Sequence, residues 1–174
     1  MYLGDTSEVY TDFPLYLKQN YRKEHLVVDV AEQLADFAVP SNSRRQFLDK
    51  MIHEGKKIYM MDVFLPTISK AEKMGYSEAQ WNWVADNQSN IWSYFVEQKM
   101  LYSTDPKLNL RFIVNAPFSK FYNQSDKDSP GKVGVWFGAE IVRAYMENNN
   151  TSLKSMLMLN ADSILKDSKY KPKK

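Results

Sequence analysis

The apolar positions of this chain recur mainly at steps of three and four, which is the spacing of one face of an α-helix. Strand-like alternation is scarce. The predicted helices, in chain order, are 22–38, 44–65, 77–101 and 130–148, with shorter helices beginning near Asp105, Thr151 and Asn160. We therefore expect a mainly α fold, a compact domain of six or seven helices spanning residues 1–174.

Capping residues and prolines mark the ends of the predicted helices. In the first predicted helix the apolar stripe is formed by Leu26, Val30, Leu34 and Phe37. Ser41, Asn42 and Ser43 follow that helix and offer a cap for the second, which Pro66 closes. Ser77 and Gln80 match a capping box, and Ser129-Pro130 matches an N-cap followed by a first-turn proline.

A carboxylate interrupts the apolar stripe of the second predicted helix. The stripe consists of Phe47, Met51, Glu54, Ile58, Met61 and Leu65. Because Glu54 shares this face, we expect it to be mostly buried, and a buried carboxylate must be paired, protonated, hydrogen-bonded or metal-bound. Arg143, a lysine or a tyrosine hydroxyl is the expected partner. Glu54 is thus a candidate for function or for an internal salt bridge.

Two glycines four residues apart mark the last long helix. Gly134 and Gly138 lie on one face and remove side-chain bulk there, at a cost of about 1 kcal/mol each against Ala. A pair on one face indicates close approach of another backbone, and Gly55 fits the approaching surface. We predict that this face packs against the helix that carries Glu54-Gly55.

A different face of the same helix carries ionisable groups. This face is formed by Trp136, Glu140, Arg143 and Glu147. Two interpretations are open: a solvent-facing ladder in which Arg143 pairs with either glutamate, or a buried pair between Arg143 and Glu54 or Asp62. Asp62, Gly134, Trp136, Gly138 and Arg143 are accordingly structural or interaction candidates.

His53-Glu54-x-x-Lys57 invites comparison with the HExxH zinc motif. That motif needs two histidines four residues apart on one helical face, whereas the second position here is Lys57, which would repel a metal ion. His25 is the remaining histidine and the chain has no cysteine. A zinc site made within these residues would need several carboxylates. We therefore expect no metal and no cofactor, with Glu54 the one candidate ligand.

Charge and hydropathy exclude several classes of protein. Lys and Arg number 23 against 21 Asp and Glu, so the formal net charge is +2 and both signs are scattered. This argues against nucleic acid as a partner, because the dense basic run is limited to residues 169–174, which we expect to be a solvated tail. No apolar run reaches membrane-spanning length, and the first residues are acidic where a signal peptide would be basic. Either the protein is cytoplasmic or a targeting segment lies upstream.

The chain resembles the C-terminal half of the gliding motility lipoprotein GldB family. The resemblance rests on MYLG at 1–4, FPLYLKQNY at 13–21, MIHEGKKIYMMDVFLP at 51–66, IWSYFVEQKMLYSTD at 91–105, NAPF at 115–118, SPGKVGVWFGAEIVRAYMENN at 129–149 and SKYKP at 168–172. It implies a lipoprotein of the bacterial cell envelope, at the outer membrane and facing the periplasm. It also implies a role in gliding and type 9 secretion, with other proteins of those machineries as partners. Membrane contact would come from a lipid anchor that these residues do not contain.

That family is also distantly similar to zincin-like metallopeptidases, in which an EG pair supplies the third zinc ligand. Glu54-Gly55 matches that pair, so the resemblance implies the helical part of a zincin-like fold. The histidine helix would lie upstream of Met1, and Lys56 and Lys57 depart from a metal-binding pattern. Two functions follow: a non-enzymatic domain that binds other proteins, or a zinc-dependent hydrolase whose HExxH lies upstream. The upstream sequence would discriminate between them.

Overall fold

Capping residues set where several helices begin. Ser69, Ser77, Ser152 and Asn160 each accept a hydrogen bond from the backbone N–H three residues later, at 3.1, 3.2, 3.2 and 2.9 Å. The predicted capping box of Ser77 and Gln80 is confirmed, since Gln80 also accepts from the Ser77 N–H at 2.9 Å.

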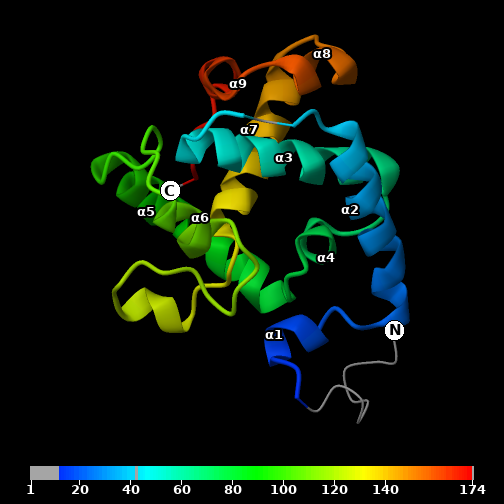
Figure 1. Cartoon of the computed structure of the whole chain (residues 1–174), viewed down its shortest axis with the longest axis vertical. Helices are drawn as coiled ribbons and strands as arrows, with labels where there is room; N and C mark the ends of the chain where they lie inside the picture. The colour runs from blue at the N-terminus through cyan, green and yellow to red at the C-terminus, as the bar shows by residue number, and fades with distance from the viewer. Residues whose placement is uncertain (1–11, 42, 174) are drawn as a thin grey trace.

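The computed structural model describes residues 12–41 and 43–173, and within these ranges it is mainly helical with no strand (Figure 1). Its α-helices are α1 (Leu15–Lys18), α2 (Leu26–Ala38), α3 (Phe47–Phe64), α4 (Lys70–Met74), α5 (Glu78–Glu97), α6 (Lys107–Phe112), α7 (Val133–Asn148), α8 (Leu153–Met158) and α9 (Ala161–Ser168). Short 3₁₀ turns cover Lys23–His25 and Gln124–Lys127. The mainly α prediction is confirmed, while α1 and α4 were not predicted.

Two predicted helix starts were wrong by three residues. The second long helix begins at Phe47 rather than near 44, because Gln46 is its N-cap and exchanges capping hydrogen bonds with Asp49. The last long helix begins at Val133 rather than Pro130, because Lys132 adopts a left-handed backbone with φ of 57°. These local conformations depend on contacts that the apolar spacing does not record.

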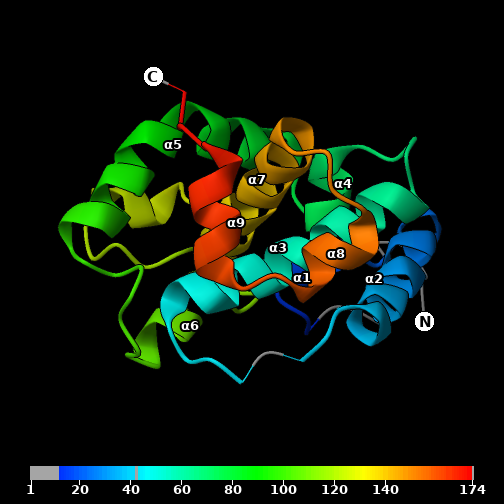
Figure 2. The same cartoon turned by 90° about the horizontal axis from the view of Figure 1, so that it is seen from above.

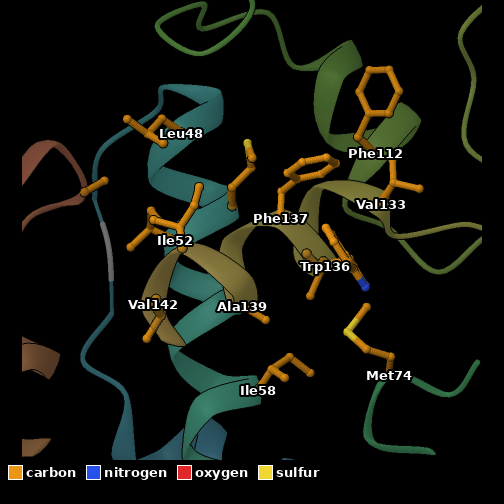
Figure 3. Close-up of a cluster of buried hydrophobic side chains, with 14 of the residues drawn as sticks. Leu48, Ile52, Ile58, Met74, Phe112, Val133, Trp136, Phe137, Ala139 and Val142 are labelled. Carbon is orange, nitrogen blue, oxygen red and sulfur yellow. The ribbon is translucent and has the colours of Figure 1, made fainter. Parts of the chain in front are cut away.

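Helices α3 and α7 cross at the centre of the molecule, with α9 beside α7 (Figures 1 and 2). Figure 3 shows Leu48 and Ile52 of α3 and Phe137, Ala139 and Val142 of α7 along the two crossing helices, all of them buried. Aromatic rings extend this core: Phe47, Phe95, Phe112, Phe121 and Phe137 are each within 5.8 Å of another ring of the set, between centroids. The large apolar residues of four helices therefore form one interior.

Helix α2 packs on α3 through its small residues. Val28, Ala31 and Ala35 are buried. The stripe that the sequence singled out in this helix, Leu26, Val30, Leu34 and Phe37, is exposed instead. Alanines permit close approach of the two helices, so α2 presents its small side chains to α3 and its large ones outward.

The C-terminal tail is partly anchored. The Tyr170 ring lies 5.6 Å from Trp92 and 6.4 Å from Phe137, between centroids, and the Lys173 N–H donates to Gln88 Oε1 at 3.0 Å. Lys169, Lys171 and Lys173 are exposed, as expected of a solvated tail, whereas Tyr170 is half-buried against the core. Across the described ranges, the helices are too short or too polar to cross a membrane.

Candidate functional site

The crossing of α3 and α7 is made at glycines, as the sequence predicted. A Cβ atom placed on Gly138 would overlap the carbonyl oxygen of Met51, and one placed on Gly55 would overlap the carbonyl group of Gly138. Gly134 meets a different neighbour, with a Cβ there 2.9 Å from the carbonyl oxygen of Phe112 in α6. The two helix backbones are therefore in direct contact, which sets the positions of all polar groups around them.

Glu54 lies at the edge of this contact. Its side chain is 29% exposed and pairs with Lys57 at 3.0 Å, while Lys57 also pairs with Asp36 of α2 at 2.9 Å. A lysine partner was among those predicted, and the side chain is mostly buried as expected, but Glu54 lies at the margin of the core face rather than in its middle. The buried face of α3 is centred on Met51 and Gly55, and Glu54 flanks it. The carboxylate is therefore stabilised by a half-buried ion pair.

Asp62 and Arg143 form the buried ion pair that was one of the two interpretations. Arg143 Nε donates to Asp62 Oδ2 at 2.7 Å, and Lys73 Nζ of α4 donates to Asp62 Oδ1 at 2.8 Å. Arg143 Nη1 also donates to Glu140 at 2.6 Å, so the predicted pairing along α7 is present as well. Because Arg143 is only 5% exposed, the solvent-facing ladder is excluded.

Opposing effects act on these ionisable groups. Burial would raise the pKa of Asp62, but hydrogen bonds and positive charge from Arg143 and Lys73 outweigh it and lower the pKa below the usual value. Burial likewise opposes the charge on Arg143, whereas Asp62 and Glu140 raise its pKa. Both groups are thus held in their charged forms. This network joins α3, α4 and α7 and acts as a structural clamp.

Trp136 has a packing role. It is 3% exposed, and its ring lies 5.8 Å from Trp81 and 5.0 Å from Phe137, between centroids. Its indole N–H is buried without a hydrogen-bond acceptor in the described part of the chain. An unsatisfied buried donor costs stability, so Trp136 contributes through the packing of its ring and not through a hydrogen bond.

A cavity of about 330 Å³ opens beside Glu54, between α2, α3 and the start of α7. Its ionisable lining comprises His25, Asp29, Glu32, Glu54, Lys57, Lys73 and Lys132. Burial lowers the pKa of Lys132, and the nearby carboxylates of Glu32, Glu54 and Asp29 offset this in part. The cavity therefore brings together charges of both signs from segments far apart in sequence.

His53 lines a different cavity. That second cavity, of about 270 Å³, is bounded by α3 and the segment between α8 and α9 and also includes Asp49 and Lys56. Burial lowers the pKa of His53. Lys57 lies outside this lining, so His53 and Lys57 of the HExxH-like segment face separate cavities. Within the described residues, no cluster of three or more His, Asp or Glu side chains is arranged to hold a metal ion.

The sequence pattern did not reveal the roles of three lysines. Lys56 is buried and donates to the carbonyls of Leu157 and Leu159 at 2.8 and 2.7 Å, which ties α3 to the end of α8. Lys73 is buried in the Asp62 network, and Lys132 lines the cavity. The one available signal was Lys56 next to Gly55, since a residue adjoining the buried glycine lies near the core face. The other two positions depend on tertiary contacts.

Comparison with known proteins yields one family. A family model described as "Gliding motility protein GldB" matches residues 1–172. No curated protein matches the chain, and no solved structure matches it.

Proposed function

Because the chain belongs to the gliding motility protein GldB family, we propose that it serves gliding motility and type 9 secretion by binding other proteins of those machineries. We place it in the cell envelope, as part of a lipoprotein held at the outer membrane and facing the periplasm. The observation that carries the proposal is the family match over residues 1–172. On this proposal the domain is not an enzyme.

The geometry supports a binding role in two ways. The charged side chains at the α3–α7 centre pair with one another, as in the Asp62–Arg143 pair at 2.7 Å, which suits a structural role. Large apolar side chains meanwhile remain on the surface, including Phe37 of α2 at 89% exposure. Exposed apolar groups in clusters favour protein contacts.

The experiment is gene replacement in the bacterium that carries the protein. Deletion should abolish spreading on agar and reduce secretion by the type 9 pathway, and the unaltered gene should restore both. A Glu54→Gln variant should also restore both, because a binding domain does not need this carboxylate for chemistry. Glu32→Gln, in the same cavity wall, is the matched control. Normal gliding and secretion in the deletion strain would contradict the proposed function.

One observation favours a second function, a zinc-dependent hydrolase related to zincins. Glu54 lies on the wall of the 330 Å³ cavity, where its carboxylate contacts Lys57 at 3.0 Å. The carboxylate is 29% exposed at that wall, and a metal ligated jointly by residues from another segment would have to displace Lys57 from it. Under this function Glu54→Gln would abolish gliding at normal protein levels while Glu32→Gln would not. Zinc bound by the complete gene product and lost in Glu54→Gln would support the same conclusion.

A further inference from the structure

One side of helix α5 carries a row of amide and aromatic side chains. We call it the α5 row; it consists of Trp83, Asn87, Asn90, Tyr94 and Glu97. These residues follow one another at steps of four, three, four and three, so they share one side of the helix. Asparagine is a poor helix former, so the two amides do not serve the helix itself.

The α5 row lines a third cavity, of about 390 Å³, which we call the α5 cavity. The segment that includes Phe121 and Asn123 also lines it, and Figure 1 shows this part of the chain beside α5. Ile91 and Phe121 are buried and supply apolar surface within the lining. A volume of about 300–1,000 Å³, with apolar surface and a few polar groups, is typical of a site for a small molecule.

The contacts around Tyr94 hold the α5 cavity in shape. Arg111 of α6 donates to the Tyr94 hydroxyl from Nη2 at 2.9 Å and to the carbonyl of Lys120 from Nε at 2.8 Å. The Tyr94 hydroxyl donates to the carbonyl of Phe121 at 3.4 Å, and the two rings lie 5.5 Å apart between centroids. The segment near Phe121 is thus fixed against α5 by the fold itself.

Trp83 differs from the other three tryptophans. Trp81, Trp92 and Trp136 each lie within 5.8 Å of another aromatic ring, between centroids. Trp83 is half-buried, lines the α5 cavity and has no such ring contact within the described part of the chain. The electron-rich face of an aromatic ring packs well against C–H groups, and a sugar ring presents C–H groups on its faces.

The amides around the α5 cavity have unused hydrogen-bonding capacity. Asn87 donates from Nδ2 to the carbonyl of Trp83 at 2.9 Å, which leaves its side-chain oxygen available. Asn123 accepts from the Ser125 N–H at 2.9 Å, which leaves its amide N–H groups available. The Asn90 amide is exposed and makes no hydrogen bond to any described residue. The lining therefore offers donors and acceptors together, which suits hydroxyl groups because each hydroxyl both donates and accepts.

Charge decides between possible ligands. Of the described residues that line the α5 cavity, Glu97 alone carries a formal charge, so a phosphate or another anion would meet a carboxylate and no basic side chain. Glu97 is exposed, so a cation paired with it would gain little. An apolar helix seated here would bury the unused amides without partners, which costs stability. An uncharged ligand rich in hydroxyl groups meets none of these penalties.

We propose that the α5 cavity binds a short, uncharged oligosaccharide. The ring of Trp83 packs on one face of a sugar unit, while the amides of Asn87 and Asn90 exchange hydrogen bonds with its hydroxyl groups. From Trp83 to Glu97 the row extends about 21 Å at 1.5 Å per residue, so more than one linked sugar unit can contact it. This site lies on a different helix from Glu54, and it goes beyond the proposed function without depending on it.

The test is isothermal titration calorimetry of the 174-residue chain with three uncharged trisaccharides: the trimer of N-acetylglucosamine, cellotriose and maltotriose. At least one should bind one to one with a dissociation constant below about 1 mM. The affinity should stay the same between about 0.05 and 1 M salt, because screening does not act on an uncharged ligand. Trithymidylate, an anion of similar length, should not bind under the same conditions.

Variants locate the bound sugar. Asn90→Ala should weaken binding about threefold or more through the lost hydrogen bonds, while the melting temperature stays equal or rises because alanine favours the helix. Asn82→Ala is the matched control, since Asn82 is exposed on the same helix and lies outside the cavity lining. Trp83→Ala should weaken binding at least about tenfold, whereas Trp83→Phe should retain most of it because a ring remains.

Three results would overturn the proposal. If none of the three trisaccharides binds, the ligand class is wrong. Equal weakening by Asn82→Ala and Asn90→Ala would show that the sugar binds elsewhere on the chain. Trithymidylate that displaces the trisaccharide would show that the cavity accepts anions, which the charge argument excludes.

Discussion

Gly138 of α7 rests on the backbone of Met51 in α3, so closely that no Cβ atom fits at Gly138 without overlapping the Met51 carbonyl oxygen. Gly55, one turn further along α3, meets the carbonyl group of Gly138 in the same way. Backbone contact of this kind cannot be relieved by a side-chain rotation. The geometry of the whole interior therefore depends on the absence of side chains at these two positions.

Replacing Gly138 by Ala should destabilise the fold. On an open helix face this change would gain about 1 kcal/mol of helix propensity, but here it forces α3 and α7 apart and should cost about 1–3 kcal/mol net. Glu147→Ala, on the exposed side of α7, is the control and should be close to neutral. Urea unfolding followed by circular dichroism gives both values. A Gly138→Ala variant more stable than the parent would contradict the contact.

The Asp62 network should make stability depend on acid. Since positive neighbours lower the pKa of Asp62 in the folded state, its contribution is fully present above the ordinary value of 3.8 and is lost as the pH falls through the lower, folded value. Asp62→Asn should be less stable than the parent at pH 7. The difference should diminish as the pH drops below 3.8. Paired urea titrations from pH 7 downward test this, and a difference that grows on acidification would rule it out.

Lys56 should make stability rise with pH as well, but in an alkaline window. Burial lowers its pKa from 10.5 to about 8, so the folded state binds fewer protons than the unfolded state between these values and stability rises with pH. The neutral amine retains two N–H groups for the carbonyls of Leu157 and Leu159. The parent should gain up to about 3 kcal/mol relative to Lys56→Met between pH 8 and 10.5. Melts of both proteins across that range provide the measurement; a constant difference would show that Lys56 does not titrate there.

Glu54 should matter little for stability. Its partly exposed pair with Lys57 is worth at most about 1 kcal/mol, so Glu54→Gln should lower stability by no more than that. Arg143→Met should cost about 3–5 kcal/mol, because it leaves Asp62 with a single buried partner. Thermal unfolding of the two variants compares them directly. A loss of stability larger than about 1 kcal/mol for Glu54→Gln would contradict the half-exposed ion pair and indicate that the carboxylate is a buried partner.

The parts of the candidate site that could be predicted are those whose residues lie at helical spacing within one helix. The glycine spacing in α7 predicted the contact with α3, and the choice of partners for Arg143 included Asp62. The sequence pattern placed Glu54 in the middle of the buried stripe of α3. The buried face is instead centred on Met51 and Gly55, so the adjacent Glu54 lies at its edge. Lys73 lies in the network only because α4, an unpredicted helix of five residues, returns the chain to α3.

Sequence alone determined the mainly α fold, the long helices and the close approach of α3 and α7, because periodicity, caps and glycines act within a few residues. Tertiary structure alone decided which side of α2 is buried. That helix has apolar residues around much of its circumference, and the alanine side fits against α3 while the larger Leu34 and Phe37 remain outside. The positions of Lys56 and Lys132 were decided likewise. Lys56 is buried where the carbonyls of Leu157 and Leu159 accept from its amine, and Lys132 lines the cavity near the carboxylates of Glu32, Glu54 and Asp29. Those neighbours come together only when the chain is folded.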